Sequence, residues 1–137
     1  MAIKETPEIK RKEFTYRGKT LDELKKLDVR EFSRYLKSRA RRTALRQFQK
    51  IESFVNRAKT KNDKEKTIRT HQRNLIIVPE MVGMKISIHD GRNFIPVAIT
   101  EEMLGHRLGE FAVTRGKVKH SKAGIGATKG SKFKAKK

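Results

Sequence analysis

The chain has 137 residues, a formal net charge of +20 and no cysteine, which excludes a disulfide framework. Charged residues make up 36% of it, which is high for a globular domain, and hydrophobic residues make up 35%, which is low. We therefore expect no large hydrophobic core. Such a charge repels itself and calls for a polyanionic partner. We expect nucleic acid first and an acidic membrane surface second.

The sequence gives no sign of membrane insertion or export. No apolar run approaches the roughly 20 residues that span a bilayer. The start of the chain, Met1 to Glu5, lacks the apolar core of a signal peptide. We therefore expect a cytoplasmic protein.

Residues 1–19 alternate charged residues with few apolar ones and predict a basic N-terminal arm that becomes ordered on contact. Residues 20–60 predict a helical extension. Thr20 with Glu23 has the spacing of a capping box, and Asp28 with Glu31 repeats that spacing, so two short helices are expected.

From Ser38 the pattern predicts one amphipathic basic helix. Its apolar positions recur three and four apart. They are Ala44, Leu45, Phe48, Ile51, Val55 and Ala58. Four arginines on this helix have no acidic residue to pair with at i+4, so we interpret them as phosphate contacts rather than an ordinary solvated face. They are Arg39, Arg41, Arg42 and Arg46.

Residues 59–66 show no periodicity and predict a loop that acts as a hinge between the helices and a central module. Within the module, Leu75 to Val78 predicts a first strand, Met84 to His89 a second and Phe94 to Ile99 a third. Asp90-Gly91 predicts a hairpin turn between the last two. Pro96 lacks a backbone N–H, so we expect the third strand to lie at a sheet edge or to have this position facing away from its partner.

After the hairpin, Thr100 is predicted to cap a short helix that Gly105 stops, and Leu108 and Phe111 are predicted to fold back on the core. Residues 75–111 carry three positive and five negative side chains, so the module's net charge is −2 and the basicity lies in the flanks. The predicted fold is α+β: a small three-stranded sheet with short helices, an N-terminal helical extension and a flexible basic C-terminal tail.

The few cations around the sheet are predicted to grip the phosphate backbone of folded RNA. They are Arg69, Arg73, Lys85, Arg92 and Arg107. Arg69, His71 and Arg73 alternate, which places all three on one side of an extended segment. His71 is interpreted as facing phosphate or stacking on a base, whereas His89 and His106 are left open between structural and RNA-facing roles.

Beyond Glu110 no acidic residue remains, and nine positive residues occur in the last 26. Residues 115–137 are therefore predicted to be a flexible basic tail, with a stretched reach on the order of 85 Å for the whole acid-free segment. Arg115, Lys117 and Lys119 are predicted to bind RNA near the module. Farther residues are assigned to the extended tail itself: Lys122, Gly124, Gly126, Thr128, Lys129 and Lys132.

Patterns for catalysis or cofactor binding are weak. Gly124-Ile125-Gly126 followed by Gly130 fits neither dinucleotide-binding nor Walker spacing. The four histidines lie far apart without carboxylates at metal-ligand spacing. Glu101, Glu102 and Glu110 are better explained by helix capping and local pairing than by acid–base catalysis. We expect neither an enzyme nor a cofactor.

The central module contains a set of distinctive motifs: Asp90-Gly91-Arg92, Ile99, Leu104 to Phe111 and Thr114, with Arg69 to Arg73 and Ile76 to Gly83 upstream. Together these motifs resemble the small-subunit ribosomal protein nineteen family. The resemblance is dense from Ile68 to Thr114, so residues 68–114 are taken as an rRNA-binding α+β module. The extension from Phe14 to Ala58, and Gly124 to Thr128 with Phe133, resemble the family's archaeal and eukaryotic branch.

The resemblance implies a structural component of the small ribosomal subunit head. It further implies binding to rRNA beside ribosomal protein thirteen, with a tail that extends toward the decoding region and tRNA. The rival reading from another class is a free basic protein that compacts DNA or RNA. Its weakness is the absence of a recognition helix on a dimeric frame. A membrane-surface role is weaker still, because the basic helix needs its apolar stripe for the core.

Overall fold

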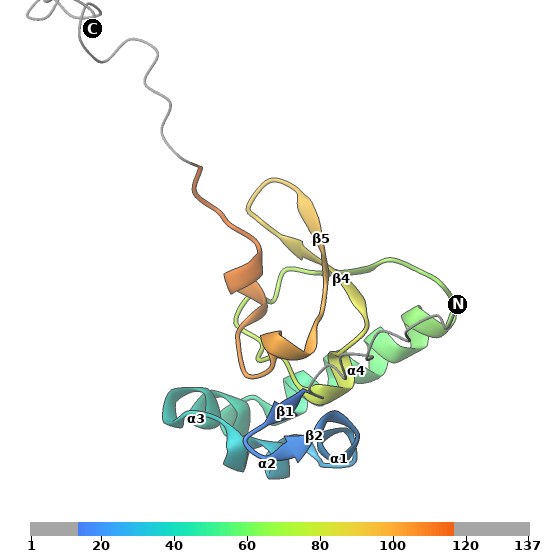
Figure 1. Cartoon of the computed structure of the whole chain (residues 1–137). Coiled ribbons are helices and arrows are strands. Elements are labelled where there is room, and N and C mark those ends of the chain that lie inside the picture. Colours follow the sequence, from blue (N-terminus) through green and yellow to red (C-terminus); the bar gives the residue numbers. More distant parts are fainter. Residues whose placement is uncertain (1–13, 117–137) are drawn as a thin grey trace, which may run out of the picture.

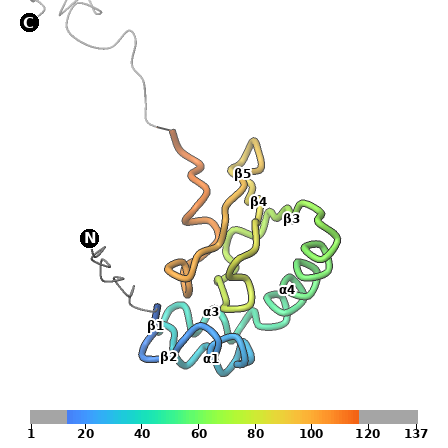
Figure 2. The backbone as a smooth tube through the Cα atoms, turned by 45° about the vertical axis from the view of Figure 1, so that its right-hand side comes forward, coloured from blue at the N-terminus to red at the C-terminus, as the bar shows by residue number. Residues whose placement is uncertain are grey.

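The computed structural model describes residues 14–116. Three short helices gather at one end, a three-stranded sheet lies at the other, and a longer helix runs beside both (Figures 1 and 2). The helices are α1 (Leu21–Lys25), α2 (Val29–Phe32), α3 (Ser38–Arg46) and α4 (Phe48–Asp63). The α+β class with a small three-stranded sheet, short helices and an N-terminal helical extension is confirmed.

The described part of the predicted N-terminal arm is folded. Strands β1 (Thr15–Tyr16) and β2 (Lys19–Thr20) pair antiparallel, and the Tyr16 ring lies 6.0 Å from the Phe32 ring of α2. This contact gives residues 14–19 an anchor on the helices that charge alternation alone did not indicate. Residues 1–13 of the arm lie outside the described part of the chain.

The two predicted capping boxes have different outcomes. Asp28 Oδ1 accepts a hydrogen bond of 2.7 Å from the Val29 N–H, and Glu31 Oε2 accepts one of 3.4 Å from the Asp28 N–H, so this box is confirmed. Thr20 stands at the N-cap of α1, but its side chain makes no capping bond. Thr20 also ends β2, where pairing with Thr15 already fixes its backbone.

The predicted single basic helix is two helices, because the chain breaks at Gln47 (φ −116°, ψ 18°) between α3 and α4. The break turns Leu45 out of the apolar stripe, and this side chain is 47% exposed. Conversely, α4 continues to Asp63 through much of the predicted loop over residues 59–66. No glycine or proline interrupts that stretch, so the absence of an apolar stripe did not end the helix.

The sheet has the order β3–β4–β5, with β3 (Ile68–Thr70), β4 (Lys85–His89) and β5 (Phe94–Ala98). The predicted hairpin is confirmed: β4 and β5 pair antiparallel, and Gly91 adopts a positive φ of 106° in the turn. Pro96 lies on an edge strand as predicted. The hairpin projects away from the helices (Figure 1).

The first strand was predicted in the wrong segment. Residues 75–78 are fully buried, but β3 is the strand that pairs parallel with β4. The segment from Leu75 to Ile77 runs extended against the loop that contains Arg107, through bonds such as Ile77 N–H to His106 O (2.9 Å) and Leu108 N–H to Leu75 O (3.0 Å). A short apolar run indicates that a segment is buried on all sides. It does not indicate which other segment forms backbone hydrogen bonds with it.

The helices and the sheet share one hydrophobic core. Buried Leu24, Phe32, Ile51, Ile76 and Ile86 belong to a single cluster. The side chain of Lys59 on α4 also pairs with Glu80 of the module. The predicted hinge near residues 59–66 is therefore wrong, and the helices are part of the folded body.

Three short 3-10 helices complete the module, η2 (Pro79–Met81), η3 (Glu101–Met103) and η4 (Leu108–Phe111). Thr100 precedes η3 as predicted, but its side chain makes no capping bond. Leu108 is fully buried and Phe111 packs at the edge of the core, so the predicted return of this segment is confirmed.

Candidate nucleic-acid interface

Two carboxylates of the module, those of Asp90 and Glu110, accept bonds from their own loops. Asp90 Oδ1 accepts hydrogen bonds from the N–H groups of Asn93 (2.6 Å) and Arg92 (2.7 Å), which hold the pKa of its carboxyl below the ordinary value. Desolvation raises the pKa of Glu110, but bonds from the Arg107 N–H and the His106 ring outweigh it, and the net shift is downward. These acids shape loops, in agreement with the structural reading of the sequence.

Arginines on α3 divide into two groups. All four are exposed, as expected for phosphate contacts, but Arg41 is bonded to the chain itself. The side chain of Arg41 turns back onto the preceding chain, where Nε donates to Ser33 O (3.1 Å) and Nη2 donates to Arg34 O (2.8 Å) and Leu36 O (3.3 Å). The last carbonyls of a helical segment have few partners within the helix, and Arg41 donates to three of them, including Ser33 O, which also accepts from the Leu36 N–H. Its guanidinium therefore has a structural role that the sequence did not indicate.

Arg73 makes the second internal clamp. Its guanidinium donates to His89 O (2.6 Å), to Gly109 O (2.7 Å) and to Ala112 O, which ties the β4 end to η4 and the segment after it. The chain approaches so closely that a Cβ on Gly109 would lie 2.9 Å from Arg73 O. Arg73 was predicted to lie beside Arg69 and His71 on one open side, but it is half-buried while the other two are exposed. Its three bonds fix it within the fold.

The other predicted cations of the module sit on its surface. Arg69, Lys85 and Arg92 are exposed on the sheet or its turn. Arg107 is half-buried and its Nη2 lies 3.4 Å from Thr43 Oγ1, so it links the module to α3. Arg115 is exposed near the end of the described chain.

The salt bridges within residues 14–116 are Lys19–Glu23, Lys59–Glu80 and His106–Glu110, and none of them involves an arginine. The exposed arginines of this region thus keep their charge available to an external anion. The predicted tail residues lie outside the described part of the chain. They are Lys117, Lys119, Lys122, Gly124, Gly126, Thr128, Lys129 and Lys132.

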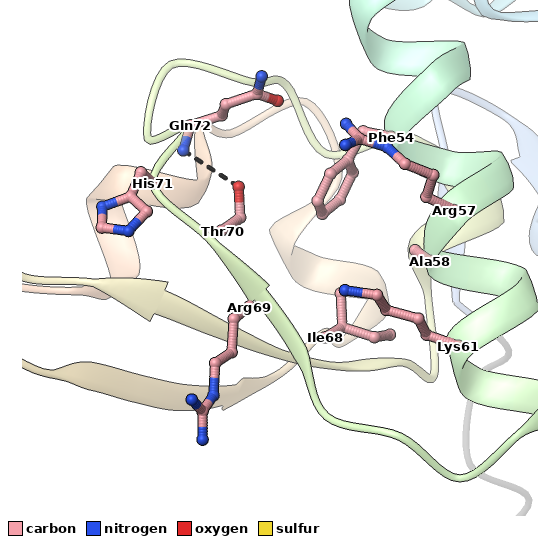
Figure 3. Close-up of a pocket in the computed structure, with 9 residues that line it drawn as sticks. All are labelled: Phe54, Arg57, Ala58, Lys61, Ile68, Arg69, Thr70, His71 and Gln72. Atoms are coloured by element: carbon pink, nitrogen blue, oxygen red, sulfur yellow. Dashed lines mark hydrogen bonds between the residues drawn. The ribbon is translucent and has the colours of Figure 1, made fainter.

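A groove of about 270 Å³ between α4 and β3 contains cations that sequence analysis missed. Arg57 and Lys61, one turn apart on α4, reach from the helix toward the strand, whereas Arg69 and His71 point away on the far side of β3 (Figure 3). Phe54, Ala58 and Ile68 form its apolar part. The i, i+4 spacing of the two cations was the available signal, but Lys61 fell in the predicted loop over residues 59–66.

His71 lies beside two other rings on the outer side of the sheet. Its ring centroid is 4.3 Å from that of His89 and 5.0 Å from that of Phe94. Phe94 was read from the sequence only as a strand residue.

The described residues offer little for other chemistry. Within residues 14–116, no group of three or more histidine, aspartate or glutamate side chains is placed to hold a metal ion. No helix in this range combines the length and apolar character needed to cross a membrane. What the region presents is an array of exposed cations on a shaped surface.

The sequence was compared with protein families and with individual proteins, and both comparisons point to a ribosomal protein. The family model described as ribosomal protein S19 matches residues 34–120. The chain is 48% identical over 128 residues to the small ribosomal subunit protein uS19 of Methanocella arvoryzae, an alignment that covers 90% of this chain and 87% of that protein. A match of this length to an archaeal protein agrees with the archaeal and eukaryotic branch that the motifs indicated.

Proposed function

Since this chain belongs to the ribosomal protein S19 family and is a structural constituent of the small ribosomal subunit rather than an enzyme, we propose that it holds rRNA through two arrays of exposed cations. One array is Arg39, Arg42 and Arg46 on α3. The other is Arg69, Lys85 and Arg92 at the sheet. Arg115 and the basic residues that follow add a third contact along the tail.

The main support for this proposal is that the arginines of the described region form no salt bridges with acidic side chains. Among residues 14–116 the arginines make no salt bridge, while Asp90 and Glu110 are bonded to their own loops. Unpaired guanidinium groups on a rigid body suit phosphate, which they bind with charge-assisted hydrogen bonds. An A-form duplex hides most of its base edges, so shape and phosphate dominate recognition.

Salt dependence of rRNA binding tests this mechanism. Neutralising on the order of ten phosphates gives a slope of log K against log salt near about −7 to −9. The full chain is titrated with small-subunit rRNA at several salt concentrations, and its sedimentation with the small subunit is followed in moderate salt. A slope close to zero contradicts the proposal.

We further propose a place in the head of the subunit, beside ribosomal protein thirteen, with the tail directed toward the decoding region and tRNA. The family resemblance of the module and of Gly124 to Thr128 supports this arrangement. A chain truncated after Thr114 is expected to enter the subunit and to weaken tRNA binding at the decoding region. If the truncated chain no longer enters the subunit, the tail is the anchor and the proposed roles are reversed.

Family membership sets aside the rival reading of a free nucleic-acid-compacting protein. It does not by itself say which residues touch RNA. That assignment rests on hydrogen bonding and exposure. Arg41 is exposed like Arg39, Arg42 and Arg46, but its guanidinium is bonded to three carbonyls, whereas Arg73 is half-buried and Arg69 is exposed.

A further inference from the structure

Three flat rings meet on the solvent-facing side of the β3–β4–β5 sheet. The ring centroids of His71, His89 and Phe94 lie 4.3, 4.9 and 5.0 Å apart. His71 follows β3, His89 ends β4 and Phe94 begins β5 opposite His89, so three parts of the chain converge at this point. We call these three rings the ring platform.

The core does not account for this cluster. Side chains on the inner side of the sheet, such as Ile68, Ile86 and Ile88, are buried in the hydrophobic core. The outer side alternates with them and is more open: Arg69, His71 and Lys85 are exposed, while His89 and Phe94 are half-buried. Aromatic rings on an open sheet face are available to stack on a flat ligand.

The sheet turn fixes the orientation of one ring. His89 Nδ1 accepts a hydrogen bond of 3.1 Å from the Gly91 N–H. The neutral form of the ring that matches this bond carries its proton on Nε2. His89 is thus presented as an oriented ring at the base of the hairpin.

Cations surround the platform. The Arg69 guanidinium lies 5.5 Å from the centre of the Phe94 ring. Lys66 and Lys85 line an adjoining hollow of about 480 Å³ on the same sheet face, which Ser87 and Pro96 also border. Glu65 is the acidic residue along that hollow, so positive charge prevails there. Rings beside cations match the chemistry of a nucleotide, whose base stacks and whose phosphate is anionic.

We propose that the ring platform stacks one unpaired base of rRNA, while Arg69 and Lys85 contact the phosphates next to that base. This inference rests on the proposed function and narrows it, because it assigns one sheet face to single-stranded RNA. A paired base within an A-form helix does not expose its flat face, so the occupant must be a loop, bulge or end.

The test uses the full chain and two RNA probes: a short single strand that carries one fluorescent adenine analogue, and a blunt duplex of the same length. Stacking quenches the analogue. His71→Ala and Phe94→Leu are each expected to lower affinity for the single strand about tenfold, to reduce quenching and to leave duplex affinity unchanged. The salt slope stays the same, because neither change removes a cation.

His106→Ala is the matched control, since it removes an imidazole whose side chain is 52% exposed and which lies outside the platform. Thermal melting verifies that each variant is folded. If Phe94→Leu fails to fold, the exposed His71 decides the question. Phe94→Tyr, which keeps an aromatic ring, is expected to retain wild-type affinity.

Two outcomes overturn the proposal. Folded His71→Ala that binds and quenches the single strand as the wild-type chain does shows that no base stacks there. Unchanged RNA affinity together with lost retention of a neighbouring ribosomal protein in the subunit shows that a protein side chain occupies the platform. Failure of the proposed function looks different, because the wild-type chain itself then shows no salt-dependent rRNA binding.

Discussion

The α3 region and the β3 region are both rich in arginine, yet each divides its arginines between two uses. On α3, Arg42 points to solvent while Arg41 is bonded to three carbonyls at the end of the preceding helical segment. At β3, Arg69 points to solvent while Arg73 is bonded to three carbonyls of two distant segments. The carbonyls that the fold places within reach, rather than the charge pattern, distinguish the guanidinium groups that turn back onto the chain.

The two inward arginines differ in what they join. Arg41 contacts carbonyls five to eight residues away, so it stabilises a local turn. Arg73 contacts carbonyls 16 to 39 residues away, so it closes the module. Loss of the Arg73 bonds is expected to lower the free energy of unfolding more than loss of the Arg41 bonds, because no local structure holds the distant segments together.

The largest effect is therefore expected for Arg73→Ala. Loss of the bonds to His89, Gly109 and Ala112 leaves carbonyls without a donor, which lowers the free energy of unfolding by about 3 kcal/mol. Urea unfolding of the purified chain measures it. Arg92→Ala, at an exposed position of the turn, is the matched control and changes that energy by less than about 0.5 kcal/mol. If Arg73→Ala and Arg92→Ala lower the free energy of unfolding equally, the Arg73 side chain does not stabilise the module more than an exposed arginine does.

The sequence predicted the hairpin well and the rest of the sheet poorly. Alternation in Lys85 to His89 and the Asp90-Gly91 turn are local signals, and local hydrogen bonds realise them. Pairing of β3 with β4 joins residues far apart in sequence and leaves no local trace. Leu75 to Val78 looked like a strand because full burial and strand pairing give similar apolar runs.

A second large effect is expected for the triple variant Arg39→Ala, Arg42→Ala, Arg46→Ala. These side chains make no salt bridge among the described residues, so stability changes little. Affinity for rRNA is expected to fall between about tenfold and a hundredfold, with a salt slope shallower by about two. The same positions changed to lysine retain the charge and most of the slope. An unchanged slope in the alanine variant would take α3 out of the interface.

Candidate interface residues were predictable only in part. Exposure of Arg39, Arg42 and Arg46 followed from an acid-free stretch of helix. Nothing in the local sequence distinguished Arg41 or Arg73 from their neighbours, because their carbonyl partners are set by the fold. Arg57 and Lys61 were missed because the helix that aligns them was predicted to end before Lys61.

A smaller effect is expected at Arg41, which tests the local clamp. Arg41→Ala removes bonds to the Ser33, Arg34 and Leu36 carbonyls and is expected to cost about 1 kcal/mol in the free energy of unfolding. Arg41→Lys keeps the charge but not the forked geometry, so it recovers less than half of that loss. The salt slope for rRNA stays that of the wild-type chain. A shallower slope with unchanged stability would place Arg41 with the RNA-facing group.

The smallest effect concerns the loop from Arg107 to Phe111. Desolvation raises the pKa of Glu110, but bonds from the Arg107 N–H and from His106, at 2.7 Å from the carboxylate, leave that pKa below its ordinary value. A carboxyl whose pKa is lower when folded stabilises the protein above its unfolded pKa. That contribution is lost as pH falls through the folded pKa.

Unfolding of the wild-type chain is therefore expected to become easier below about pH 4.5, by a few tenths of a kcal/mol more than unfolding of Glu110→Gln. The effect is small because the Glu110 side chain is 49% exposed and solvent screens its bonds. Urea titrations at stepwise lower pH compare the two chains, with exposed Glu102→Gln as the control. If Glu110→Gln follows the wild-type curve, these bonds add no pH-dependent stability, and the loop is held by its backbone bonds to residues 73–77 and by the Arg73 guanidinium.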